Sequence, residues 1–321
     1  MTRLGIITNP RSRQNRKGFA AVRDLVASAR DVWHEELESI GDLDDILRRF
    51  AAAGVEVIAV NGGDGTVHGV LTALCNGAGY ETMPPLAVLH GGMTNLMAHD
   101  IGISGRPSEA LEKLLRCLAG GVGLRRVERP LLSIDYHPER PTAHGMFFGS
   151  GVFYRASMLT RQQVHPLGAE RSVAVFLSLL WFIWQAIRGG GRSNDLFRGE
   201  DMALSLDGTK AIRGKSLALL TTTLDQLILG IKPFWGDGGG RIRYTVLPYP
   251  ARGLARAAIQ ILRGRYRPWM GDLGYLSGRA NELEFSAEGP MVLDGEVLIP
   301  REGTRVRIRS DRTASFVTVD G

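Results

Sequence analysis

The chain has 321 residues, of which 44% are hydrophobic and 22% charged, a composition that describes a globular protein and excludes a disordered one. This length suits two domains of ordinary size. The net charge of +6 is carried mainly by arginine and fits an anionic partner such as a membrane surface, ATP or nucleic acid. Because no basic cluster alternates with aromatic side chains that stack on bases, a nucleic-acid site is not expected.

The first 125 residues alternate short apolar strands with helical patterns. Strands are predicted at residues 4–8, 55–60 and 86–89, and helices at about 19–26, 43–50 and 107–118. This alternation predicts an α/β domain with a parallel sheet and helices on both faces, in which ligands bind at the carboxyl ends of the strands.

From about residue 130 the pattern changes to short strands separated by turn residues. Asp207-Gly208 is a good hairpin signal between two of them. The strands are predicted at residues 131–136, 146–148, 202–206, 210–218, 242–247 and 283–285. A second, mainly antiparallel β domain is therefore expected.

The cysteines and the apolar stretches indicate a cytoplasmic protein that is soluble or peripheral. Cys75 and Cys117 lack metal-ligand spacing and are expected to be buried, reduced thiols. The longest apolar stretch, residues 173–187, is shorter than the ~20 residues that cross a bilayer. The first strand begins so early that no signal peptide is expected.

The most informative segment is Asn61-Gly62-Gly63-Asp64-Gly65-Thr66, which lies between a strand and a helical pattern. Its glycines let a phosphate approach backbone N–H groups, and the start of the following helix favours negative charge. Asp64 alone would repel a phosphate, so it fits such a site if a cation lies between them or if it contacts a hydroxyl. The segment therefore suggests a nucleoside-triphosphate site with a divalent metal. An ordinary strand-to-helix turn is the alternative.

Four segments together resemble the diacylglycerol kinase catalytic-domain family, which includes bacterial lipid kinases, sphingosine kinases and ceramide kinases. The Gly-Gly-Asp-Gly core also occurs in NAD kinases and phosphofructokinases, so the other three segments narrow the resemblance. In chain order the four are Asn9-Pro10-Arg11-Ser12, the segment 61–66, Gly91-Gly92-Met93-Thr94-Asn95-Leu96-Met97-Ala98, and Asp294-Gly295-Glu296. The resemblance implies a nucleotide-binding domain at residues 1–127, a β-sandwich lipid-substrate domain with helical insertions at 128–304, and a return of residues 305–321 to the first domain.

The resemblance also implies a set of ligand-binding residues. ATP would be bound by Asn9, Ser12, Asn61, Gly62, Gly63, Gly65, Thr66, Gly92, Thr94 and Asn95. Arg11, Arg13, Arg16 and Lys17 lie just after the first strand, where one or two of them, Arg16 included, would bind phosphate oxygens and the others would form a solvated basic loop. Asp64 would organise Mg²⁺ near the β- and γ-phosphates, and Asp237 would bind a structural Mg²⁺.

The same resemblance assigns the proton acceptor for the lipid hydroxyl to Glu296 or, second, to Asp294. In some relatives the loop aspartate has this role, so the division between Asp64 and Glu296 stays open. Asp294 and Glu296 would project to one face of a strand, or Asp294-Gly295 would form a hairpin turn. Leu96 and Met93 replace an Asp and a Thr of the family pattern. One carboxylate is thus missing, which implies that the other acids suffice, that the substrate differs, or that catalysis is weakened.

Two segments of the β region suggest contact with a bilayer. Residues 172–188 are apolar nearly all round and predict either a buried core helix or a helix that touches the membrane with its tryptophans. Residues 254–267 predict a basic amphipathic helix that suits an anionic membrane surface, or else a solvated charged face.

The sequence thus predicts an ATP- and Mg²⁺-dependent lipid kinase that phosphorylates the primary hydroxyl of a neutral lipid of the diacylglycerol or ceramide type. It would bind peripherally to the inner face of the membrane, and a homodimer is left open. The alternatives are a soluble kinase related to NAD kinases and a non-catalytic lipid-binding or regulatory protein.

Overall fold

The computed structural model describes residues 2–319 except residues 13, 92–100, 122, 164–194, 226 and 228–231. The chain divides into two compact units. The N-terminal unit comprises Met1–Leu131 and Arg312–Gly321, and the C-terminal unit comprises Leu132–Asp311. The apolar segment 172–188 lies outside the described residues.

The N-terminal unit contains a parallel sheet with the strand order β2-β1-β3-β4. The strands are β1 (Leu4–Thr8), β2 (Val32–Glu36), β3 (Val57–Gly62) and β4 (Leu86–His90), with β5 (Gly102–Ile103) and Phe316 of β16 (Arg305–Val319) paired in parallel with β4. The strands β1 and β3 are buried throughout, as expected of a parallel sheet covered on both faces.

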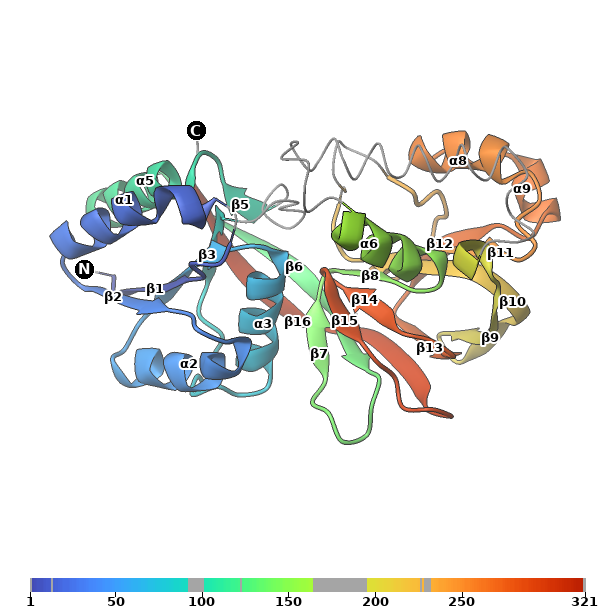
Figure 1. The fold of residues 1–321 in the computed structure, drawn as a ribbon, viewed down its shortest axis with the longest axis horizontal. Helices are drawn as coiled ribbons and strands as arrows, with labels where there is room; N and C mark the ends of the chain where they lie inside the picture. The colour runs from blue at the N-terminus through green and yellow to red at the C-terminus, as the bar shows by residue number, and fades with distance from the viewer. Residues whose placement is uncertain are drawn as a thin grey trace. The chain divides into compact units, whose positions relative to one another are not determined.

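Helices cover both faces of this sheet (Figure 1). They are α1 (Asn15–Ser28) and α5 (Pro107–Gly120) on one face, and α2 (Leu43–Ala52) and α3 (Asp64–Cys75) on the other. Leu111 and Leu114 of α5 pack with Ile6 and Ala59 of the sheet in one buried core. The helix α5 ends at Gly120, close to the predicted end, because Gly121 adopts the left-handed conformation.

The C-terminal unit is mainly antiparallel, and with the parallel N-terminal sheet this confirms the predicted fold class. Its strands are the last part of β6 (Leu124–Asp135), β7 (Ala143–Gly145), β8 (Phe147–Gly149), β9 (Glu200–Leu206), β10 (Thr209–Thr222), β11 (Ile242–Pro248), β12 (Leu276–Ala280), β13 (Glu282–Ser286), β14 (Met291–Leu293), β15 (Glu296–Leu298) and the first part of β16. Its helices are α6 (Val152–Gln163), α8 (Leu254–Leu262) and α9 (Pro268–Asp272).

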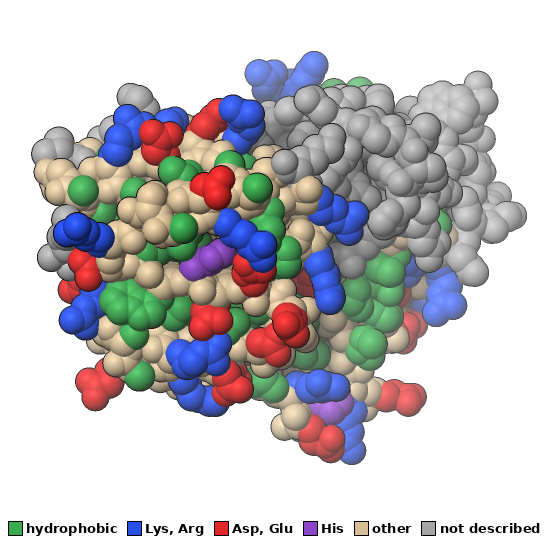
Figure 2. All heavy atoms as spheres, turned by 60° about the vertical axis from the view of Figure 1, so that its left-hand side comes forward, with side chains coloured by type: hydrophobic (Ala, Val, Ile, Leu, Met, Phe, Trp, Pro, Cys, Tyr) green, Lys and Arg blue, Asp and Glu red, His purple; other side chains and the backbone are tan. Residues whose placement is uncertain are grey.

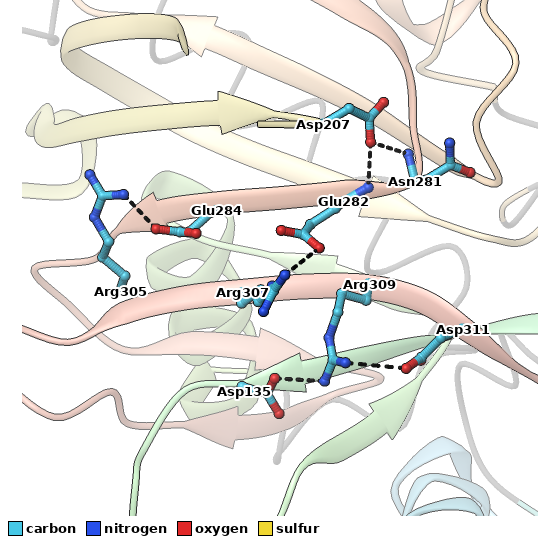
Figure 3. A network of polar contacts seen from close by, with 9 residues as sticks. All are labelled: Asp135, Asp207, Asn281, Glu282, Glu284, Arg305, Arg307, Arg309 and Asp311. Carbon is cyan, nitrogen blue, oxygen red and sulfur yellow. Dashed lines mark hydrogen bonds and ion pairs between the residues drawn. The ribbon is translucent and has the colours of Figure 1, made fainter. Parts of the chain in front are cut away.

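Alternation along β16 separates the core of this unit from its surface. Val306 and Ile308 are buried in the apolar core, whereas Arg305, Arg307 and Arg309 point outward. On that outer face each arginine meets an acid from a neighbouring strand (Figure 3). Arg305 pairs with Glu284, Arg307 with Glu282 at 2.8 Å, and Arg309 with Asp135 at 2.7 Å. This face is thus a ladder of paired charges.

Some predicted elements differ from the observed ones. The predicted basic helix 254–267 is wrong at its end: α8 stops at Leu262, because Gly264 takes a positive φ, and the short α9 follows. The strand β2 escapes prediction because Val32-Trp33-His34-Glu35-Glu36 is only half-buried at the sheet edge. Cys75 and Cys117 are not joined in a disulfide, and they are half-buried where buried thiols were predicted.

Candidate functional site

The candidate nucleotide site lies at the carboxyl ends of β1 and β3. The order β2-β1-β3-β4 sends the chain to one side of β1 first and then to the other, so the ends of β1 and β3 border the switch point where such sheets bind ligands. Asn9 follows β1, and Asn61 and Gly62 end β3. Gly91 follows β4. The structure therefore brings together Asn9, the segment 61–66 and Gly91, which is the one described residue of the third segment.

The segment 61–66 is a direct strand-to-helix junction rather than a loop. Asn61 and Gly62 belong to β3, Gly63 is the N-cap, and Asp64 is the first residue of α3. The first backbone N–H groups of a helix have no partner within the helix, and the helix dipole favours an anion there. A phosphate at this end of α3 would meet both effects.

The glycines of this junction allow close approach rather than an unusual backbone conformation. A Cβ atom on Gly62 would lie 2.5 Å from Thr66 Cβ. One on Gly91 would lie 2.8 Å from the Gly62 nitrogen and 3.0 Å from Asn61 Oδ1. Neither glycine has a φ in the left-handed region. The ends of β3 and β4 can therefore pack this tightly only without side chains.

A network of asparagines fastens the ends of β1 and β3 to each other. Asn9 Nδ2 donates to Thr66 Oγ1 at 3.0 Å, and the Asn9 backbone N–H donates to the Asn61 carbonyl at 2.9 Å. Asn15, at the start of α1, donates from Nδ2 to the carbonyls of Asn9 at 2.8 Å and Asn61 at 3.0 Å. The predicted residues Asn9, Asn61 and Thr66 thus lie in one hydrogen-bonded group.

Two buried acceptors in this network have no hydrogen-bond partner among the described residues. They are Asn15 Oδ1 and Asn61 Oδ1, on residues that are 1% and 0% exposed. Buried polar atoms are nearly always paired in native proteins. The asparagine cluster therefore has hydrogen-bonding capacity left for a ligand or water.

Sequence reasoning missed three members of this group. Asn15 precedes the predicted helix at about 19–26, and its burial is visible only in the structure. Thr8 Oγ1 accepts from Asn61 Nδ2 at 3.4 Å and lies 3.0 Å from Nε2 of His34. Burial lowers the pKa of His34 below its ordinary 6.5, an effect that Glu36 partly offsets. A neutral imidazole thus ends the chain of contacts that begins at Asn61.

The remaining predicted nucleotide residues are less defined. Ser12 is half-buried, its N–H donates to the Asn9 carbonyl at 3.1 Å, and its own carbonyl accepts from the N–H of Arg16. The Arg11 and Arg16 side chains are exposed beside the site. Arg13, Gly92, Thr94 and Asn95, together with Leu96, lie outside the described residues.

The donor set at the junction fits Mg²⁺ only as a partner of phosphates. Asp64 supplies one carboxylate at the start of α3. No group of three or more His, Cys, Asp or Glu side chains that would hold a metal occurs in the described part of the chain. One or two carboxylates with phosphates and water are the usual ligands of Mg²⁺ in kinases. Asp237, the other predicted metal ligand, is exposed.

Asp294 is the first residue of a two-residue hairpin turn in the C-terminal unit, and Glu296 follows that turn. Asp294 and Gly295 have φ of 48° and 90° and join β14 to β15, so the turn interpretation holds and the continuous strand is wrong. The Asp294 carboxylate is buried and accepts from the N–H groups of Met146 and Phe147, each at 2.9 Å. Glu296 is exposed at the start of β15. Of the two, Asp294 has the contacts of a structural residue, and Glu296 has a carboxylate open to a substrate.

Comparisons with known proteins agree with this geometry. Residues 3–124 match the family model of the diacylglycerol kinase catalytic domain. Residues 3–124 are therefore similar to this kinase domain, and the predicted resemblance is confirmed. Over 211 residues the chain is 28% identical to a probable lipid kinase YegS-like protein of Chromohalobacter salexigens, covering 58% of this chain and 64% of that protein. The match thus spans less than two thirds of that relative's length.

Solved structures show the same fold over nearly the whole chain. A diacylglycerol kinase structure from Bacillus anthracis has a TM-score of 0.62 at 16% identity, covering 99% of this chain and 97% of that one. A second structure from this organism has a TM-score of 0.64 at 17% identity, with the same coverage. In the described residues no helix is both long and apolar enough to cross a membrane.

Proposed function

We propose that this protein is an ATP- and Mg²⁺-dependent lipid kinase that phosphorylates the primary hydroxyl of a neutral lipid. The observation that carries the proposal is the junction of β3 and α3, where glycines, a helix N-terminus and the carboxylate of Asp64 meet at the sheet's switch point. This junction lies within the residues that match a diacylglycerol kinase catalytic domain.

Phosphoryl transfer depends mainly on positioning and on neutralising charge at the phosphates. The first turn of α3 and the backbone near Gly91 would bind phosphate oxygens, while the asparagine network holds the strand ends in place. Asp64 would hold Mg²⁺, which when bound neutralises charge on the β- and γ-phosphates. We assign the acceptance of the lipid hydroxyl proton to Glu296, because its carboxylate is exposed whereas that of Asp294 binds two backbone N–H groups.

The substrate we propose is diacylglycerol or a ceramide-like lipid. Such lipids stay in the bilayer, so the enzyme would work at the inner face of the membrane as a peripheral protein. Leu96 stands where the family has an Asp in the segment 91–98. Because this change is compatible with a different lipid acceptor, we propose ceramide almost as strongly as diacylglycerol.

The test is a phosphoryl-transfer assay with γ-labelled ATP and Mg²⁺. Mixed micelles would contain diacylglycerol, ceramide, sphingosine or a polyprenol in turn, and NAD would serve as a soluble acceptor. Label in one lipid that disappears in Asp64→Asn supports the proposal and names the substrate. Label in NAD alone would make the protein a soluble kinase.

Leu96 also favours a second candidate, a lipid-binding protein without catalysis. That protein would bind vesicles but transfer no phosphate to any acceptor. Absence of label in every arm, from a folded protein that still binds lipid, would select it.

A further inference from the structure

An exposed segment of the C-terminal unit, Tyr249–Asp272, has a strong excess of positive charge. It contains five arginines and one acidic residue, Asp272. All five arginine side chains are exposed, and none forms an ion pair with another described residue. The arginines are Arg252, Arg256, Arg263, Arg265 and Arg267. We call this segment, which includes α8 and α9, the basic segment.

Apolar side chains are exposed beside these charges. Six large hydrophobic side chains are exposed in the described part of the chain, and three of them belong to the basic segment. They are Tyr249, Ile259 and Tyr266, at 39%, 51% and 51% exposure. Single exposed hydrophobic side chains are ordinary on a protein surface. Here three of the six lie within a segment of 24 residues, which points to a surface that contacts an apolar phase.

Charge and apolar surface share one face of α8 and its flanks. Arg256, Ile259 and Arg263 follow one another at spacings of three and four residues along α8 and its C-cap, which places them on one side of the helix. Arg252 precedes the left-handed N-cap residue Gly253. The opposite side, with Ala257 and Ile261, is buried against Met270 and Tyr275. A basic amphipathic helix with an isoleucine in its outer stripe matches the pattern of helices that lie in a membrane interface.

The basic segment is held in place by its own contacts. The guanidinium of Arg256 lies 4.4 Å from the ring centroid of Trp269, which ties α8 to α9. Tyr275 Oη donates to the Arg252 carbonyl at 3.0 Å. Figure 1 shows α8 and α9 side by side. The surface is therefore formed before any partner binds, so little entropy is lost on docking.

Two other charged surfaces among the described residues differ from the basic segment. Arg305, Arg307 and Arg309 of β16 are paired with acids (Figure 3). On the face of the N-terminal unit in Figure 2, positive and negative side chains are interspersed, and Arg23 and Arg49 pair with Glu36 and Glu35. The basic segment differs from these two surfaces in its excess of arginines without an ion pair, and this charge favours an anionic partner.

We propose that the basic segment is the surface through which this protein docks on anionic phospholipid membranes. Its arginines would bind lipid phosphates, while Ile259 and the two tyrosines enter the headgroup region. A nucleic-acid backbone would satisfy the arginines but gives no partner to an exposed isoleucine. The inference rests on the proposed function for its purpose, since a kinase of bilayer lipids must reach the membrane surface.

The experiment is sedimentation of the full chain with vesicles, without ATP. The vesicles consist of phosphatidylcholine alone or of phosphatidylcholine with phosphatidylglycerol. We expect binding only with the anionic lipid, and a loss of at least about tenfold in the partition coefficient for Arg263→Gln/Arg267→Gln. Ile259→Asp should also weaken binding. The matched control, Arg305→Gln/Arg307→Gln, removes the same charge from the paired ladder and should change binding less than about threefold.

Several outcomes would overturn the proposal. Equal binding to both kinds of vesicle would exclude recognition of anionic lipid. If the control variant lost as much vesicle binding as the Arg263/Arg267 variant, the loss would depend on the net charge of the protein and not on the basic segment. Binding to duplex DNA or RNA that the Arg263/Arg267 variant loses, without vesicle binding, would assign the segment to nucleic acid. Asp64→Asn separates the two proposals, because it should abolish lipid phosphorylation and keep vesicle binding; docking without kinase activity in the unaltered protein would refute only the proposed function.

Discussion

At the scale of single residues, the candidate nucleotide site depends on positions that have no room for another atom. Gly62→Ala places a Cβ atom 2.5 Å from Thr66 Cβ, where the backbone of α3 must shift. We expect a loss of about 1–3 kcal/mol in the free energy of unfolding and weaker ATP binding. Urea denaturation and nucleotide titration measure the two effects.

A matched glycine in α1 provides the control for this prediction. Gly18 is helical, and a Cβ atom there would meet nothing within 4 Å. Gly18→Ala should therefore stabilise the protein by about 0.5–1 kcal/mol through helix propensity and leave ATP binding unchanged. If both substitutions behaved alike, the tight packing at Gly62 would have no energetic importance.

His34 makes the stability of the N-terminal unit sensitive to acid. Because burial lowers its pKa below 6.5 in the folded state, the unfolded chain binds the proton more readily. The contribution of neutral His34 to the free energy of unfolding is complete above about pH 6.5 and decreases as the pH falls below that value. Urea midpoints measured from about pH 8 to pH 5 should fall less steeply in His34→Gln than in the unaltered protein. Parallel curves would show that other groups cause the acid sensitivity.

At the scale of elements, the hairpin of β14 and β15 separates a structural acid from a candidate base. Asp294→Asn replaces one acceptor by a donor that faces a backbone N–H, and should cost about 2–3 kcal/mol of stability. The Glu296 side chain is exposed, so Glu296→Gln should change the free energy of unfolding by less than about 0.5 kcal/mol. The same substitution should lower kcat by about 10²–10⁴-fold, because it removes the proposed proton acceptor. Thermal unfolding and single-turnover kinetics distinguish the two losses.

The outcome for Glu296 decides the assignment of the base. Near-normal turnover of Glu296→Gln, together with an inactive Asp64→Asn, would transfer the proton-accepting role to Asp64. A further control is Gly145, where a Cβ atom would lie 2.0 Å from Asp294 Oδ2. Gly145→Ala should therefore reproduce the instability of Asp294→Asn without touching Glu296.

Sequence patterns predicted those elements whose local chemistry agrees with their final environment. Asp207-Gly208 and its hairpin, the helix ended by Gly121, and the buried strand β3 are of this kind. The strand β2 was not predicted, because its side chains do not alternate clearly between buried and exposed and its position at the sheet edge leaves it half-buried. The role of Asn15 was not predicted, because the two carbonyls that accept its hydrogen bonds belong to residues 6 and 46 positions away, which no local sequence pattern reveals.

At the scale of the whole molecule, each compact unit has its own core and its own proposed ligand. Leu111 and Ile6 belong to the core of the N-terminal unit, and Phe148 and Phe285 to that of the C-terminal unit. The change from helical to strand patterns near residue 130 was enough to predict these two fold classes. Composition could not predict the ligands. The nucleotide site was predicted from short segments at the ends of strands, and for the basic helix the sequence left a membrane surface and a solvated face open.

Hydrogen exchange can therefore test both ligands on the intact chain. Mg²⁺ and ATP at about 100 times the Kd should stabilise the unit that binds them by about 2.7 kcal/mol. We expect slower exchange in residues 9–16 and 61–75, where the amide network and the first turn of α3 lie, and no change in residues 249–272. Anionic vesicles should slow exchange in residues 249–272 and leave 61–75 unchanged. ATP protection confined to residues 249–272 would contradict the nucleotide site, because the arginines there would then bind phosphates of the nucleotide instead of the membrane.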